Sequence, residues 1–101
     1  MKTVFGVFGD PVEHSLSPVM HNAAFSELGM DNIYHAFRVR KDSLKDALMG
    51  AGAMGFGGVN ITVPLKQEGL KIVTADPLAA RIGAINTVDF KDKNKIWGYN
   101  T

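Results

Sequence analysis

Apolar positions along the chain follow two different periods, and these periods predict strands that alternate with helices. Residues 3–8, TVFGVF, form a nearly continuous apolar run that stops at Gly9, Asp10 and Pro11. Such a run is typical of a strand that is covered on both faces, as in a parallel sheet. We expect further strands over residues 33–39, 59–63, 84–90 and 96–99, the last two joined as a terminal hairpin.

The first helix is predicted over residues 18–28, because both of its ends carry helix signals. Ser17 is suited to cap the helix, Pro18 to occupy its first position and Gly29 to end it. An apolar stripe predicts which face of a helix is buried. In this helix the stripe consists of Met20, Ala23, Ala24 and Leu28.

A second helix is predicted to begin near Asp42 or Ser43. Its apolar residues recur at the helical spacing i, i+3, i+4 and i+7, as Leu44, Ala47, Leu48 and Ala51. Two more helices are expected over residues 64–73 and 76–81, the latter capped by Asp76. Strands that alternate with helices indicate β-α-β units. We therefore predict an α/β fold with three layers, in which a mostly parallel sheet of about six strands carries helices on both faces.

Composition narrows the functional classes. The chain has 101 residues, of which 46% are hydrophobic and 21% charged, and its net charge is +1. This length corresponds to one domain, and the near balance of charge provides no attraction to nucleic acid or an anionic membrane. Cysteine is absent, so disulfides and thiolate metal sites are excluded. We expect a soluble, cytoplasmic protein.

The histidines give no indication of a metal centre. His14, His21 and His35 lack the spacing of metal ligands, and no metal is expected. We interpret all three as structural, with His21 on the exposed side of the first helix.

Lys66 stands where the local electrostatics oppose it. It falls in the first turn of the helix predicted to open at Pro64, and the amino end of a helix carries partial positive charge. Asn60 and Thr62 are two residues apart in the preceding strand, so their side chains share one face near its carboxyl end. Two readings stay open: polar residues that bond to nearby loops beside a solvated lysine, or a binding site with a functional lysine.

Two further positions carry candidate binding groups. Ser15 and Ser17 directly precede a helix, where free N–H groups favour a carboxylate or a phosphate, although a cap and a turn residue would explain them as well. Asn86 is predicted to start or occupy a strand, where asparagine is depleted. This mismatch indicates either a backbone bond at the end of the sheet or a ligand.

Four motifs follow one another along the chain. They are FGDP with HSLSP and HN at 8–11, 14–18 and 21–22, NITVPLK at 60–66, GAINT at 83–87, and GYNT at 98–101. Together they resemble the N-terminal, substrate-binding domain of shikimate dehydrogenase, and the resemblance spans the whole chain.

The resemblance implies a part in the reversible, NADP-dependent reduction of 3-dehydroshikimate to shikimate, a step of chorismate and aromatic amino-acid biosynthesis. In that family two serines hold the substrate carboxylate, while asparagine, threonine and lysine groups bind the ring hydroxyls. Carried over motif by motif, the implied substrate-binding residues are Ser15, Ser17, Asn60, Thr62, Lys66 and Asn86. The resemblance also makes Lys66 the catalytic residue.

The family pattern extends further than this sequence does. It continues past Thr101 with an aspartate that partners the lysine, and then with a Rossmann domain for NADP. The Gly-rich fingerprint of such a domain has no counterpart in the 101 residues. We therefore expect residues 1–101 to be the substrate-binding domain of a longer enzyme, inactive alone and unable to bind NADP by the normal site.

Two alternatives remain open at this stage. The chain could come from a quinate/shikimate dehydrogenase, although Ser15 and Ser17, in place of a Ser-x-Thr pattern, favour shikimate. It could also be a stand-alone ligand-binding module that self-associates, with a homodimer formed through apolar surface that truncation exposes.

Overall fold

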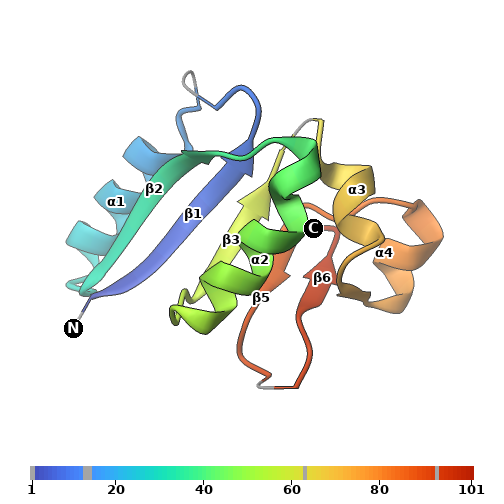
Figure 1. Ribbon diagram of the computed structural model, residues 1–101. Coiled ribbons are helices and arrows are strands. Elements are labelled where there is room, and N and C mark those ends of the chain that lie inside the picture. The colour runs from blue at the N-terminus through green and yellow to red at the C-terminus, as the bar shows by residue number, and fades with distance from the viewer. Residues whose placement is uncertain (1, 13–14, 63, 93) are drawn as a thin grey trace.

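Six strands form one sheet across the chain (Figure 1). The computed structural model describes residues 2–12, 15–62, 64–92 and 94–101. The strands are β1 (Thr3–Gly9), β2 (Asn32–Arg38), β3 (Gly58–Ile61), β4 (Thr74–Ala75), β5 (Thr87–Asp89) and β6 (Trp97–Tyr99). The helices are α1 (Ser17–Glu27), the 3₁₀ turn η1 (Lys41–Ser43), α2 (Leu44–Ala53), α3 (Lys66–Leu70) and α4 (Pro77–Ile82).

The order of the strands is β2-β1-β3-β5-β6-β4. β1 runs parallel to β2 and β3, and β4 runs parallel to β6, whereas β5 is antiparallel to both of its neighbours. The predicted α/β fold is therefore confirmed, with a sheet that is mixed and mostly parallel. The terminal hairpin predicted from residues 84–99 is the antiparallel pair of β5 and β6.

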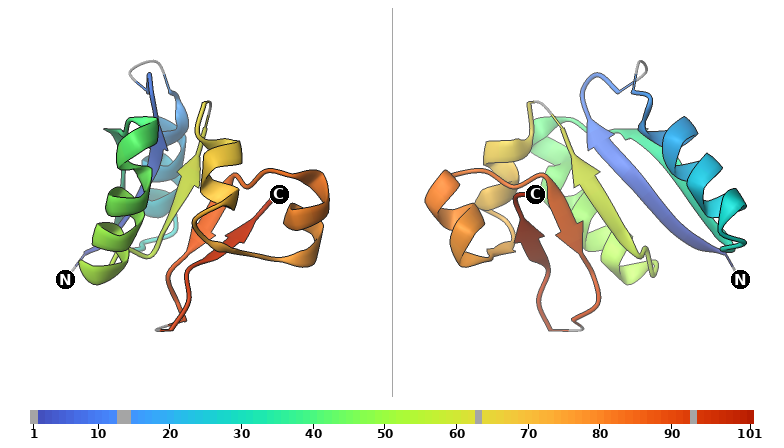
Figure 2. Two further views of the ribbon diagram at one scale, coloured as in Figure 1. Left: turned by 45° about the vertical axis from the view of Figure 1, so that its right-hand side comes forward. Right: turned by 180° about the vertical axis from the view of Figure 1, so that it is seen from behind.

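Helices lie on both faces of the sheet, as the alternation of elements predicts. Seen from behind, α1 lies in front of the sheet beside β2, while α2 lies on the far side (Figure 2, right). In the same view no helix stands in front of β3 and β5. On this face β3 and β5 are thus without a helical cover from the described part of the chain.

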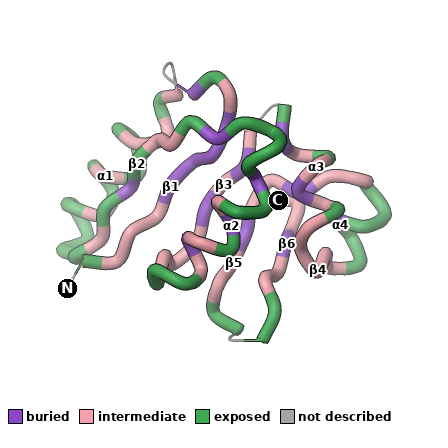
Figure 3. Tube along the Cα trace, viewed as in Figure 1, coloured by how far each residue is buried: buried purple, intermediate pink, exposed green. Residues whose placement is uncertain are grey.

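The face of the sheet beneath α2 forms the hydrophobic core. The stripe predicted for this helix is confirmed, because Leu44, Leu48 and Ala51 are buried and Ala47 is partly buried against the core. They pack against the fully buried side chains of Ile61, Ile85 and Val88. Figure 3 shows this burial along the central strands.

The stripe predicted for α1 is wrong. Met20 and Leu28 are 67% and 71% exposed, Ala23 and Ala24 are exposed as well, and α1 contains no buried residue. The helix contacts the sheet through a different face, on which the Phe25 ring lies 5.7 Å from another phenylalanine ring in β1. Apolar periodicity failed here because part of the contacting face is polar.

The start of α1 also differs from its prediction. Ser17 is the first helical residue rather than the cap, and Leu16 precedes the helix without a side-chain capping bond. Instead, the Ser17 N–H donates to Oγ of Ser15 at 3.2 Å. The cap predicted at Asp76 is confirmed, because its carboxylate accepts from the Ala79 N–H at 2.9 Å.

Three predicted elements are longer than the observed ones. The helix expected over 64–73 is the single turn of α3, which begins at Lys66, and the strand expected over 84–90 is reduced to β5. Within α3, buried Gly69 leaves no room for a side chain beside Ile85, and after α3 the chain continues to β4. β3 ends at Ile61, and residue 63 of the predicted strand lies outside the described residues.

Candidate functional site

One face of the sheet carries polar side chains because of the strand register. In β1, Phe5 pairs with Tyr34 of β2 and Val7 pairs with Asn60 of β3. Asn60 in turn pairs with Thr87 of β5. Paired residues point to the same side of a sheet, as do residues two apart in one strand. Tyr34, Asn60 and Thr87 therefore share the face on which α1 lies, opposite the core.

Hydrogen bonds join these side chains into one series. The Tyr34 hydroxyl donates to Oδ1 of Asn60 at 2.7 Å. The Asn60 Nδ2 group donates over longer distances to the Asn86 carbonyl at 3.3 Å and to Oγ1 of Thr87 at 3.4 Å. Oγ1 of Thr87 in turn donates to Oδ1 of Asn86 at 2.9 Å. We call Ser17, Tyr34, Asn60, Asn86 and Thr87 the polar series.

Ser17 forms the α1 end of the polar series. Its hydroxyl is hydrogen-bonded to the Tyr34 phenol, and its backbone N–H bonds to Ser15. Both serines are half-buried. The two serines are thus linked where α1 begins, through the backbone of Ser17 and the hydroxyl of Ser15.

Thr101 lies at the other end of the polar series. Asn86 donates through Nδ2 to the Thr101 carbonyl at 3.1 Å, and its Oδ1 accepts from the Thr101 N–H at 3.1 Å. The Asn86 N–H itself donates to the Tyr99 carbonyl at 2.8 Å. Asn86 lies directly before β5 rather than within it. The structure therefore contains the backbone bond at the end of the sheet, which was one of the two explanations for an asparagine at this position.

Tyr34 is the polar group most strongly affected by burial. It is 4% exposed, and burial raises the pKa of its phenol to about 12, while the side-chain hydrogen bond with Ser17 acts in the opposite direction. The phenol is therefore a neutral donor at any pH at which the protein works. The His21 ring stacks on Tyr34 with centroids 4.3 Å apart, while His21 is exposed, as predicted.

Lys66 and Thr62 flank the polar series through their backbone. Lys66 is half-buried at the first position of α3, and its carbonyl accepts from the Ile85 N–H at 3.2 Å, one residue before Asn86. The Thr62 N–H donates to the Phe8 carbonyl at 3.0 Å. The side chains of Lys66 and Thr62 form no hydrogen bond or ion pair among the described residues, which leaves their polar atoms available to a ligand.

The structure thus connects four of the six predicted residues and places the other two beside them. Ser15, Ser17, Asn60 and Asn86 belong to one set of hydrogen bonds, next to Lys66 and Thr62. The sequence prediction missed Tyr34, Thr87 and Thr101. Tyr34 is the one buried residue of β2, and a buried tyrosine hydroxyl needs a hydrogen-bond partner, but its burial is seen only in the folded sheet.

The arrangement is suited to a polyhydroxylated ligand. The polar series offers neutral hydroxyl and amide groups, with one ammonium group beside it. Within the described residues no three His, Asp or Glu side chains are grouped as metal ligands, and no helix is long and apolar enough to cross a membrane. His14 lies outside these residues.

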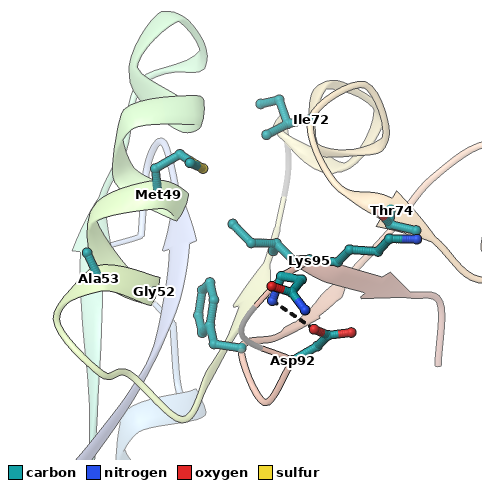
Figure 4. A pocket seen from close by; sticks show the side chains of 10 residues that line it. Met49, Gly52, Ala53, Ile72, Thr74, Asp92 and Lys95 are labelled. Atoms are coloured by element: carbon teal, nitrogen blue, oxygen red, sulfur yellow. Dashed lines mark hydrogen bonds between the residues drawn. The ribbon is translucent and has the colours of Figure 1, made fainter.

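A hollow lies elsewhere, on the α2 side of the molecule (Figure 4). It has a volume of about 590 Å³ and lies between α2 and the loop that joins β5 to β6. Apolar side chains such as Met49 and Phe90 line it together with Asp92 and Lys95. None of the six predicted site residues contributes to it.

Comparison with known proteins identifies close relatives of this chain. Residues 7–88 match the family model described as the shikimate dehydrogenase substrate binding domain. The chain is 68% identical to the shikimate dehydrogenase (NADP(+)) of Methanosarcina acetivorans, a match that covers 100% of the chain and 37% of that relative. The chain therefore spans little more than a third of the length of this relative.

Solved structures agree with the family match. A shikimate dehydrogenase crystallised with NADP+ is 46% identical and superimposes with a TM-score of 0.92, over 98% of this chain and 34% of that one. Shikimate 5-dehydrogenase from Thermus thermophilus, in complex with shikimate, is 39% identical with a TM-score of 0.90, over 97% of this chain and 38% of that one.

Proposed function

The chain belongs to the shikimate dehydrogenase family, and we propose that it supplies the shikimate-binding face of an NADP-dependent shikimate dehydrogenase. The observation that carries this proposal is the polar series beside Lys66. We assign residues 1–101 as one substrate-binding domain, and the proposed reaction is the reversible conversion of 3-dehydroshikimate to shikimate in the cytoplasm.

Each predicted residue has a role in this proposal. Ser15 and Ser17 bind the carboxylate, because both are half-buried at the start of α1, where backbone N–H groups favour an anion. Asn60, Thr62 and Asn86 bind the ring hydroxyls. Their amide and hydroxyl groups can both donate and accept, as a hydroxylated ring requires.

Lys66 is the proposed proton-transfer group. Oxidation of a secondary alcohol releases the hydroxyl proton to a base and a hydride to NADP+, and reduction of the ketone reverses both transfers. The Lys66 amine takes the proton in one direction and returns it in the other. The bond between the Lys66 carbonyl and the N–H of Ile85, the residue before Asn86, supports this assignment.

The described residues do not fit NADP. A dinucleotide-binding turn after a strand needs open space for the pyrophosphate beside its glycines. After β1 this space is filled, because methyl groups of Thr62 and Val12 lie where a side chain on Gly9 would be. In this proposal NADP binds to the part of the relatives that the chain does not span, and the 101-residue chain alone has no turnover.

The direct test joins this chain to the remaining part of the Methanosarcina acetivorans relative. This chimaera should oxidise shikimate with NADP+, and Lys66→Ala should lower kcat/KM by about 10²- to 10⁴-fold, the usual size of an acid–base contribution. Lys71→Ala is the matched control, since Lys71 is exposed and forms an ion pair with Glu68 at 3.7 Å. A chimaera that is folded but inactive on shikimate, or Lys66→Ala with normal kcat/KM, contradicts the proposal. Rates on quinate in the same assay decide between the two substrates.

A second proposal concerns self-association of the chain alone. Leu16, Val19, Met20 and Leu28, which lie in α1 or next to its ends, are each 67% exposed or more. We propose that a homodimer of the isolated chain forms through these apolar residues. Sedimentation equilibrium should give a dimer that Val19→Lys with Met20→Lys converts to a monomer, and a monomeric parent chain would contradict this.

A further inference from the structure

One phenolic oxygen lies between the two halves of the proposed site. The Tyr34 hydroxyl donates to Asn60 at 2.7 Å and is hydrogen-bonded to Ser17 on its other side. We propose that Tyr34 is a positioning residue, which fixes the Asn60 amide so that its NH₂ group faces the bound substrate. This inference rests on the proposed function, in which Asn60 binds a ring hydroxyl.

The direction of the hydrogen bond carries the argument. An asparagine side chain can present either its oxygen or its NH₂ group, and the two orientations differ by a flip of the amide. The neutral phenol of Tyr34 has one proton, which it donates to Oδ1 of Asn60. With Oδ1 held on Tyr34, Nδ2 faces the opposite way, toward Asn86 and Thr87.

The bonds on the Nδ2 side leave capacity for a ligand. They measure 3.3 and 3.4 Å, compared with 2.7 Å on the Tyr34 side. The short bond therefore determines the orientation, while the long bonds are easily exchanged for a ligand hydroxyl that accepts from the NH₂ group. Without the phenol, the amide can flip and present its oxygen instead.

Tyr34 is itself held firmly. Its backbone N–H and carbonyl both pair with the side chain of Asn22 at 2.8 Å, and its ring stacks on His21. Tyr34→Phe preserves these contacts and removes only the hydroxyl. The variant should therefore fold normally, which separates positioning from loss of structure.

The test measures Tyr34→Phe in the chimaera that contains this chain. We expect KM for shikimate to rise by about five- to tenfold with kcat within about twofold, the effect of one neutral hydrogen bond. In an Asn60→Ala background, addition of Tyr34→Phe should change KM no further. An unchanged KM, or the same rise in both backgrounds, would overturn the inference.

A second measurement does not depend on turnover. The side-chain NH₂ resonances of Asn60 in ¹⁵N-labelled chimaera, assigned through Asn60→Ala, should shift in Tyr34→Phe while the backbone spectrum outside the polar series stays the same. If these resonances do not shift, the inference fails even in an active enzyme. If they shift in a chimaera that does not turn over shikimate, the proposed function fails and the orienting role of Tyr34 stands.

Discussion

The two faces of the sheet differ in how they hold their helices. On the α2 face the contacts are apolar, and Leu44, Leu48, Ile61, Ile85 and Val88 are essentially removed from solvent. On the α1 face the helix is attached by an asparagine that bonds to the β2 backbone and by stacked rings. The apolar α2 face supplies the buried core, whereas the polar face keeps Asn60, Asn86 and Thr87 of the proposed site partly exposed.

This difference shows that the residues of the core and the residues of the proposed binding site lie on opposite sides of the same strands. In β3, Val59 and Ile61 enter the core while Asn60, between them, joins the polar series. Successive side chains of a strand point to opposite faces of the sheet, so one strand can contribute residues both to the core and to the polar series. Substitutions on the two faces should accordingly separate into losses of folding and losses of binding.

The largest expected effect on folding is in the core. Leu48→Ala should lower the free energy of unfolding by about 2–5 kcal/mol, because it leaves a cavity beneath α2. Urea unfolding of the chain, followed by the fluorescence of its single tryptophan, Trp97, measures this loss. Glu27→Ala on exposed α1 is the matched control and should change the free energy by less than about 0.5 kcal/mol. Equal losses at Leu48 and Glu27 would remove the distinction between the two faces.

A smaller loss of stability is expected for the polar attachment of α1. Asn22→Ala removes two hydrogen bonds to the Tyr34 backbone and should cost about 1–3 kcal/mol in the free energy of unfolding. The same urea experiment measures it, with exposed Ser26→Ala in α1 as the control. If Asn22→Ala matches the control, then apolar contacts alone attach α1 to the sheet.

The smallest expected effect is a change in pH dependence. The folded-state pKa of Tyr34, about 12, is raised above its ordinary value of 10.0, so the folded state holds the phenol proton more tightly. The stabilising contribution of Tyr34 is therefore complete below pH 10 and is lost as the pH rises toward 12. The free energy of unfolding of wild type should fall more steeply between pH 10 and 12 than that of Tyr34→Phe. Parallel curves for the two proteins would show that burial does not perturb this phenol.

The sequence predicted the apolar face beneath α2 better than the polar face beneath α1. The spacing of Leu44, Leu48 and Ala51 identified a buried helical stripe, because burial of apolar area follows directly from periodicity. The same reasoning failed for α1, where Asn22 and the ring of His21 contact the sheet and the apolar positions remain exposed. Periodicity does not reveal a helix that docks through hydrogen bonds.

The candidate site was predictable wherever a residue type conflicted with its local context. Asn86 beside a strand and Lys66 at a helix start both indicated a special role. In the structure the Lys66 carbonyl accepts a hydrogen bond from the N–H of Ile85, the residue before Asn86. Tyr34 showed no such conflict, since tyrosine is common in strands. Its role depends on the register that aligns β2, β1 and β3, and this register is a property of the folded sheet.

The central claim is that shikimate binds on the polar face, and hydrogen–deuterium exchange tests it most directly. In the chimaera, added shikimate should slow exchange in peptides that contain Ser17, Asn60 and Asn86. Exchange should stay unchanged in α2 and in the β5–β6 loop, which border the hollow of Figure 4. Slower exchange confined to that hollow, or no change around the three polar residues in a chimaera that turns over shikimate, would contradict the claim.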